Sequence, residues 1–244
     1  MADEGLGGRV LGVDACKAGW IGVALGNGQV TAYTAARIDE LVAAASVDGP
    51  VEVVAIDIPI GLPDTGTRQA DDLARAAVGR RWPSVFKTPV REALQAPDHA
   101  SAIAINHRLA GAGVSAQAFA LRAKLLQVDA WVRHTELRVV EVHPEVSFAA
   151  LAGMALSEPK TTWAGATHRR RLLAEAGIEI PGRARTRTAA DPDDGASLLR
   201  MDGSPRMSAE WLIASPRPGS RCRRERTDAQ AGVRACTRRR RIHH

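Results

Sequence analysis

Three acidic residues fall where strands of the predicted sheet end. Asp14 ends the first predicted strand, Asp57 ends the fourth, and Glu141 lies in the fifth. A single carboxylate after a strand is usually a turn former or a helix cap, but three together are harder to explain in that way. If Asp14 and Asp57 end adjacent parallel strands, their like charges raise one pKa unless a cation binds. The pattern therefore predicts a site for Mg²⁺ or Mn²⁺, since hard cations take carboxylate oxygens.

The chemistry that such a site predicts is hydrolysis of a phosphodiester, because two bound ions activate a water and stabilise the leaving oxygen. His143 shares a strand face with Glu141 and is a candidate for proton transfer or metal binding. A histidine beside a glutamate is as often a hydrogen-bonded structural group, so both interpretations stay open. Cys16 is a weaker candidate nucleophile, because no His–Asp pair has a matching spacing.

Basic residues follow the second predicted helix and are candidates for substrate binding: Arg80, Arg81, Lys87 and Arg91. Guanidinium groups match phosphate oxygens, although an ordinary solvated loop has the same composition. The glycine-rich segments match neither the dinucleotide fingerprint nor the phosphate loop of nucleotide-binding proteins. The tryptophans are too scattered along the sequence to predict a base-stacking platform.

The elements that must position these residues begin with three strands, over 9–14, 20–25 and 29–33, with a hairpin turn at Asn27-Gly28. Further strands are expected over 51–58 and 138–143, and helices over 38–46, 68–78, 115–134, 146–151 and 169–176. In the helix over 68–78 we expect Leu73 and Ala77 to face the core, and residues 79–89 to form an irregular loop. This order predicts an α/β fold: a three-stranded antiparallel meander plus parallel strands in one mixed sheet flanked by helices.

Charge divides the chain into two parts. The 244 residues carry a formal net charge of +6, with a pI of about 9.9. Residues 183–244 hold 15 Arg and no Lys against 7 acids, whereas residues 1–182 hold 18 basic and 20 acidic side chains. The excess positive charge lies in the C-terminal part, so the global pI gives little support to nucleic-acid binding by the globular part.

The sequence predicts a cytoplasmic protein without a membrane partner. Its three cysteines are an odd number without zinc-site spacing, which fits a reducing compartment. The N-terminal residues lack the pattern of a signal peptide, and no apolar stretch approaches 18 residues. The sequence leaves the oligomeric state open.

Five ordered blocks add a family resemblance: GVDACKAGW at 12–20, DIPIGLP at 57–63, an Arg-rich stretch at 68–91, GVSAQAFAL at 113–121 and EVHPEVSFAALAG at 141–153. Together they resemble domain of unknown function family 429 (DUF429), which is regarded as a predicted nuclease group with a ribonuclease H-like fold. The resemblance implies metal ligands at Asp14 and Asp57, and a fifth-strand group of Glu141, His143 and Glu145. It also implies a last acid from a C-terminal helix, which matches Asp194.

The chain departs from the family pattern after that acid. Gly195 and the residues beyond it replace the expected helical continuation with an Arg-, Pro- and Ser-rich sequence. We therefore divide the chain into a ribonuclease H-like domain over 8–194 and an Arg-rich irregular tail over 195–244. The tail is either the product of a frameshift near Asp194 or a genuine disordered basic tail that binds nucleic acid. A frameshift would remove the final helix and could leave this chain inactive.

The function that these observations predict is a Mg²⁺- or Mn²⁺-dependent nuclease, with Asp14, Asp57, Glu141 and Asp194 as ligands and nucleic acid as substrate. One alternative is a non-catalytic nucleic-acid-binding protein or an inactive remnant. Another is an actin-like or sugar-kinase-like phosphotransferase. That class needs a duplicated domain and a second phosphate loop, for which 182 residues leave no room.

Overall fold

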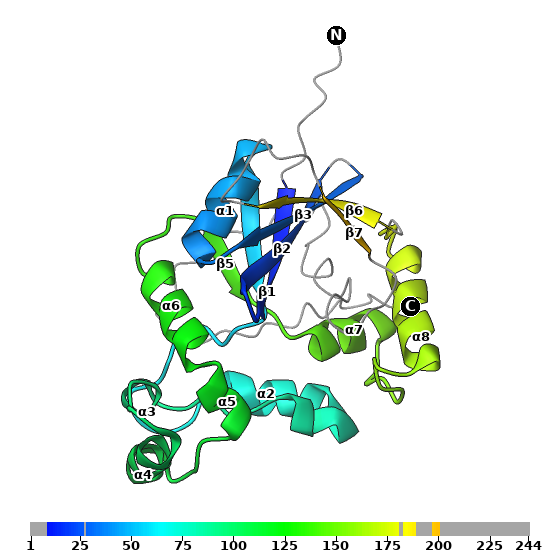
Figure 1. The fold of residues 1–244 in the computed structure, drawn as a ribbon. Coiled ribbons are helices and arrows are strands. Elements are labelled where there is room, and N and C mark those ends of the chain that lie inside the picture. The colour runs from blue at the N-terminus through cyan, green and yellow to red at the C-terminus, as the bar shows by residue number, and fades with distance from the viewer. Residues whose placement is uncertain (1–8, 27, 181–182, 189–196, 201–244) are drawn as a thin grey trace, which may run out of the picture.

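The computed structural model describes residues 9–26, 28–180, 183–188 and 197–200. The strands within these ranges form one mixed sheet in the order β5-β4-β1-β2-β3-β6-β7 (Figure 1). Their bounds are β1 Arg9–Cys16, β2 Gly19–Gly26, β3 Gln29–Ala35, β4 Val51–Ile56, β5 Arg138–Glu141, β6 Arg183–Thr188 and β7 Ser197–Arg200. The predicted fold class is confirmed: this is an α/β fold with a ribonuclease H-like mixed sheet.

The first three strands form the predicted antiparallel meander. Gly28 adopts a φ of 72°, in the left-handed region that glycine enters without strain, and Gly26 pairs with Gln29 across the hairpin. On the other side of β1, strands β4 and β5 run parallel to it. Their carboxyl ends therefore lie at the same edge of the sheet as the end of β1.

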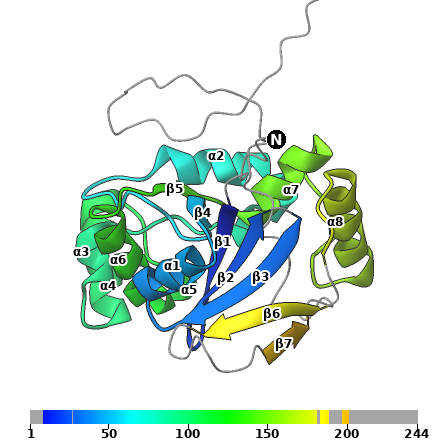
Figure 2. The same cartoon turned by 90° about the horizontal axis from the view of Figure 1, so that it is seen from above.

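Helices cover both faces of the sheet (Figures 1 and 2). Their bounds are α1 Ile38–Val47, α2 Gln69–Ala77, a 3₁₀ helix η1 Gly79–Ser84, α3 Arg91–Leu94, α4 His99–Ala110, α5 Ala116–Ala120, α6 Arg122–Val132, α7 Pro144–Ala152 and α8 Trp163–Glu175. On one face, α1 and α6 bury Leu41 and Leu125 against strand residues such as Val54. On the other face, α7 and α8 bury Phe148 and Leu172. Helices α2 to α5 gather at the end of the sheet where β1 and β4 finish (Figure 1).

Two expectations about helices were wrong. Leu73 is 44% exposed and Ala77 is also exposed, because α2 turns the carboxylate of Asp71 inward instead. The single helix expected over 115–134 is two helices that meet at Leu121. Ala118 of α5 packs with α3 and α4, whereas Leu125 of α6 packs on the sheet. One straight helix does not reach both clusters.

Other elements also differ from the expected ones. The segment 79–89, expected as a loop, begins with η1, and α4 was not expected at all. Helix α8 begins at Trp163, six residues before its expected start, because Thr162 caps it by accepting from the Gly165 amide at 3.1 Å.

The C-terminal part is described only in two short strands. Strand β6 runs parallel to β3, and β7 runs antiparallel to β6. Asp193, Asp194 and most of the Arg-rich segment over 195–244 lie outside the described residues. None of the helices within the described ranges is long and apolar enough to cross a membrane.

Candidate functional site

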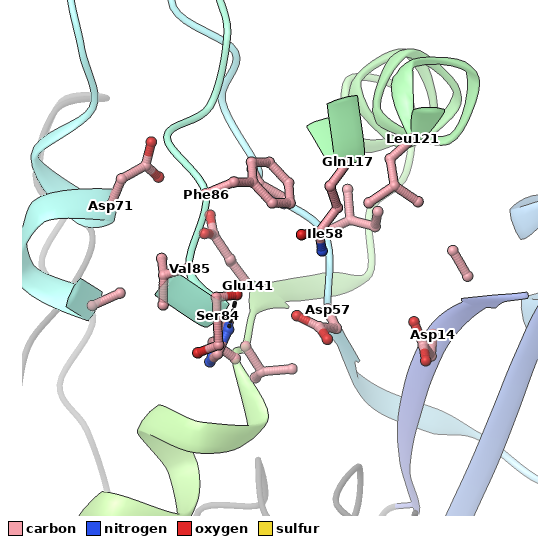
Figure 3. Close-up of a pocket in the computed structure, with 15 residues that line it drawn as sticks. Asp14, Asp57, Ile58, Asp71, Ser84, Val85, Phe86, Gln117, Leu121 and Glu141 are labelled. Carbon is pink, nitrogen blue, oxygen red and sulfur yellow. Dashed lines mark hydrogen bonds between the residues drawn. The ribbon is translucent and has the colours of Figure 1, made fainter. Parts of the chain in front are cut away.

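An open pocket of about 170 Å³ lies at the carboxyl ends of β1, β4 and β5 (Figure 3). The strand ends form one wall, and the other comes from α2, α5 and the segment that follows η1. Four acidic side chains line the pocket: Asp14, Asp57, Asp71 and Glu141. It is smaller than the roughly 300–1,000 Å³ of pockets that enclose drug-sized ligands. A phosphate group or a hydrated cation is a better match in size.

Asp14 and Asp57 are brought together by strand register. Val13 pairs with Ile56, and the Asp57 amide donates to the Val13 carbonyl at 3.0 Å. The next residue on each strand therefore points to the same face of the sheet, at the interstrand spacing of about 4.8 Å. Both side chains are half-buried, and Figure 3 shows them leaving neighbouring strands at one side of the pocket. The two strands are adjacent and parallel, which is the condition from which the sequence-based prediction of a cation site started.

Glu141 lies at the same edge, but on the other face of the sheet. It pairs with Ile56 in the parallel ladder, so its side chain leaves the face opposite to Asp57. Its carboxylate accepts from both terminal nitrogens of Arg68, with the Nη1–Oε1 distance at 3.3 Å, and from the Ile60 amide at 2.8 Å. These bonds tie the segment after Asp57 to β5.

Arg68 is the centre of a charged cluster that we name the Arg68 cluster, made of Arg68, Asp71, Thr88 and Glu141. The guanidinium, 10% exposed, donates to Asp71 Oδ1 at 3.0 Å. Asp71 is 4% exposed and also accepts from the Thr88 amide at 2.6 Å and from the Thr88 hydroxyl at 3.1 Å. A buried carboxylate requires such partners, so Asp71 fixes which face of α2 turns inward.

Arg68 and Asp71 are not among the predicted site residues, although their spacing carries a signal. The two residues stand three apart at the start of a predicted helix, a spacing at which side chains meet. What the spacing does not reveal is that Glu141, 73 residues later, joins them.

His143 lines the pocket where the chain leaves β5, and it is the residue before the first turn of α7. Its Nε2 lies 3.3 Å from the Ser84 carbonyl. Because a carbonyl only accepts, we assign the proton to Nε2, which leaves a lone pair on Nδ1. Nδ1 is buried and makes no hydrogen bond within the described residues. Burial lowers the pKa of His143, so the ring is neutral near neutral pH.

Glu145, which the family resemblance groups with Glu141 and His143, has a structural environment. Its carboxylate is 5% exposed and lies 2.7 Å from Arg169 Nη2 and 3.3 Å from Arg81 Nε. Arg169 also donates to the Glu158 carbonyl at 3.0 Å. These bonds link η1, α7 and α8 behind the pocket.

The four basic residues predicted to bind substrate lie outside the pocket lining of the described chain. Arg81 contacts Glu145, and Arg91 pairs with Asp129 of α6 and with Asp64 at 3.4 Å. Lys87 is about half exposed and lies 3.5 Å from Asp72. Arg80 is exposed on η1.

The fit of the site to a divalent cation differs among the predicted ligands. Asp14 and Asp57 fit, because they place two hard oxygen donors side by side. Glu141 does not fit in this arrangement, because its oxygens accept from Arg68 and the Ile60 amide. Within the described ranges no group of three His, Cys, Asp or Glu side chains is arranged to hold a metal, and Asp194 lies outside those ranges.

Comparisons with known proteins place the chain in a family. No curated protein and no solved structure matches it. A family model described as protein of unknown function (DUF429) matches residues 12–201, which include both strand-end aspartates and the pocket lining. The match covers well over half of the 244 residues, and the chain therefore belongs to the DUF429 family.

Proposed function

We propose that this protein is a Mg²⁺- or Mn²⁺-dependent nuclease that hydrolyses phosphodiester bonds in nucleic acid. The observation that carries the proposal is the register of β1 and β4, which places Asp14 and Asp57 on one face at the wall of the pocket. Two half-buried carboxylates on one face of the sheet offer a divalent cation the hard oxygen donors that it prefers. The cysteine pattern supports a cytoplasmic location for this activity.

The cation, when bound, would polarise a phosphoryl oxygen and lower the pKa of an attacking water. The residues of the chain supply the rest. Asp14 and Asp57 hold the cation, and neutral His143 offers its Nδ1 lone pair to a proton. Glu141 is a positioning residue: its carboxylate accepts from the Ile60 amide and so holds the segment that carries Asp57.

The size of the pocket limits what it takes up. About 170 Å³ suits one phosphate group, so the sugars and bases of a substrate lie outside. Acidic side chains from four positions line the pocket, and carboxylate oxygens are the donors that a hard cation prefers. Both features support phosphate binding through a metal ion.

The test is thermal unfolding with and without Mn²⁺, on the wild-type chain, on Asp14→Asn and on Glu141→Gln. A cation at 100 times its dissociation constant adds about 2.7 kcal/mol to the free energy of unfolding. We expect Mn²⁺ to raise the melting temperature of the wild type and of Glu141→Gln, but not of Asp14→Asn. Cleavage of a labelled single-stranded oligonucleotide should follow the same pattern.

Two outcomes would contradict the proposal. If Mn²⁺ leaves the melting temperature of the wild type unchanged in a cooperative transition, the non-catalytic or remnant alternative replaces the nuclease. If Asp14→Asn is stabilised by Mn²⁺ as much as the wild type, the cation binds elsewhere.

A further inference from the structure

We propose that Trp82 is a stacking platform for a base of single-stranded nucleic acid, beside the pocket. This inference rests on the proposed function and adds the class of substrate. Trp82 lies in η1 and is 50% exposed, whereas Trp20 is fully buried in the core. Large aromatic side chains dominate cores, and a half-exposed one next to a pocket is a candidate contact.

The ring of Trp82 is held in place from within the protein. The Arg75 guanidinium lies over the ring, 4.2 Å from its centre, and donates through Nη1 to the Val85 carbonyl at 2.5 Å. On the same 3₁₀ helix, Arg81 contacts buried Glu145. These contacts fix η1 to α2 and α7, so the exposed part of the ring is ordered before a ligand arrives. Such pre-organisation reduces the entropy lost on binding.

The charge around Trp82 suits phosphates. Residues 75–91 contain five basic side chains and no acid, although residues 1–182 as a whole hold more acids than bases. Arg80 is exposed next to Trp82, and Lys87 is about half exposed. Asp72 lies 3.5 Å from Lys87 and offsets part of this charge. Basic residues interleaved with an aromatic ring are typical of proteins that bind single strands.

The position of Trp82 links it to the proposed chemistry. Ser84, Val85 and Phe86 begin two residues after it in the chain, and all three line the pocket. A base stacked on Trp82 therefore places a neighbouring phosphate at the pocket mouth. Base faces are accessible in single strands and covered in a duplex, so the platform favours single-stranded DNA or RNA.

The test is binding of fluorescein-labelled oligothymidylate and oligouridylate of about 12 nucleotides, a length within the range that single-strand sites occupy. Fluorescence anisotropy is measured in EDTA, so that the result does not depend on a metal site. We expect Trp82→Ala to weaken binding about tenfold and Trp82→Phe to retain most of it, because stacking on one ring contributes about that factor. Trp163→Ala is the matched control, since Trp163 is 87% exposed on α8 and away from the pocket lining. Comparing the two oligonucleotides distinguishes DNA from RNA.

Each outcome bears on the inference separately from the nuclease proposal. It is overturned if the folded wild type does not bind, if Trp82→Ala binds as tightly as Trp163→Ala, or if a duplex of equal length binds as well as the single strand. Circular dichroism verifies that Trp82→Ala is folded. Loss of binding in Trp82→Ala supports the platform whatever the effect of Mn²⁺. If Mn²⁺ neither stabilises nor activates the wild type, that result refutes only the nuclease proposal.

Discussion

The pocket contains two pairs of carboxylates that differ in how they are held. Asp71 and Glu141 share the guanidinium of Arg68, a cation that the chain itself supplies. Asp14 and Asp57 are placed side by side by the backbone ladder between β1 and β4. The first pair stabilises the walls of the pocket, and the second pair, whose side chains leave one face of the sheet, is the proposed cation site. An acid at the end of a strand is thus not by itself a metal ligand.

The largest expected effect is on the cleavage rate, and it should distinguish the Asp14–Asp57 pair from the Asp71–Glu141 pair. We expect Asp57→Asn to lower Mn²⁺-dependent cleavage more than about 100-fold, since substituting residues that merely orient metal ligands already costs about 10–100-fold. Glu141→Gln should lose about tenfold or less, because it weakens the pair with Arg68 and the support of the Ile60 segment but removes no proposed cation ligand. Initial rates on a labelled oligonucleotide measure both. Equal losses of activity in Asp57→Asn and Glu141→Gln would indicate that Glu141 is a cation ligand.

The next effect concerns stability. Arg68→Met should lower the free energy of unfolding by about 3 kcal/mol, because it leaves Asp71 buried without its cation. This is the lower end of the range for broken buried pairs, since Glu141 is about one-third exposed. Urea unfolding measures the change. Arg68→Lys keeps the charge but not the two-nitrogen geometry, so its free energy of unfolding should lie between those of the wild type and Arg68→Met. A loss below about 1 kcal/mol in Arg68→Met would contradict a structural role for Arg68.

A smaller effect should appear in the pH dependence of stability. Burial holds the pKa of His143 below its ordinary value of 6.5, so the unfolded chain binds this proton more readily than the folded one. The contribution is fully present above pH 6.5 and is lost as the pH falls from there through the folded pKa. His143→Gln should therefore show a flatter fall in melting temperature than the wild type across that range. Parallel curves would show that His143 is not responsible.

The smallest effect should come from the exposed face of α2. Leu73→Ala should change the free energy of unfolding by less than about 0.5 kcal/mol, because Leu73 is 44% exposed. Asp71→Ala, two residues away on the same helix, should cost more, since it removes the acceptor for the Thr88 amide. Thermal melts of the two variants compare the faces directly. A larger loss of stability in Leu73→Ala would support the expectation from the sequence that Leu73 faces the core.

The elements that the sequence predicted well are those with a strong local signal. The Asn27-Gly28 turn and the apolar run of β4 gave the meander and the central strand, and Gly28 shows the φ that the turn requires. The elements that were missed have weak or misleading patterns. Helix α4 mixes alanine with polar residues, and the burial of Asn106 is explained by tertiary bonds: it accepts from the Val90 amide at 2.8 Å and donates to the Ala112 carbonyl at 2.7 Å. The apolar periodicity over 115–134 did not reveal that its two halves pack on different clusters.

The sequence by itself determined the sheet class, the family and the adjacent strands that carry Asp14 and Asp57, although β1 continues two residues beyond Asp14. It did so because alternation, turn residues and buried runs are local properties of the chain. Only the tertiary structure decided that Glu141 joins Arg68 rather than the aspartates, and that Trp82 is exposed beside the pocket. Those outcomes depend on register and on contacts between residues far apart in the chain, and a one-residue change of register moves a side chain to the opposite face of the sheet.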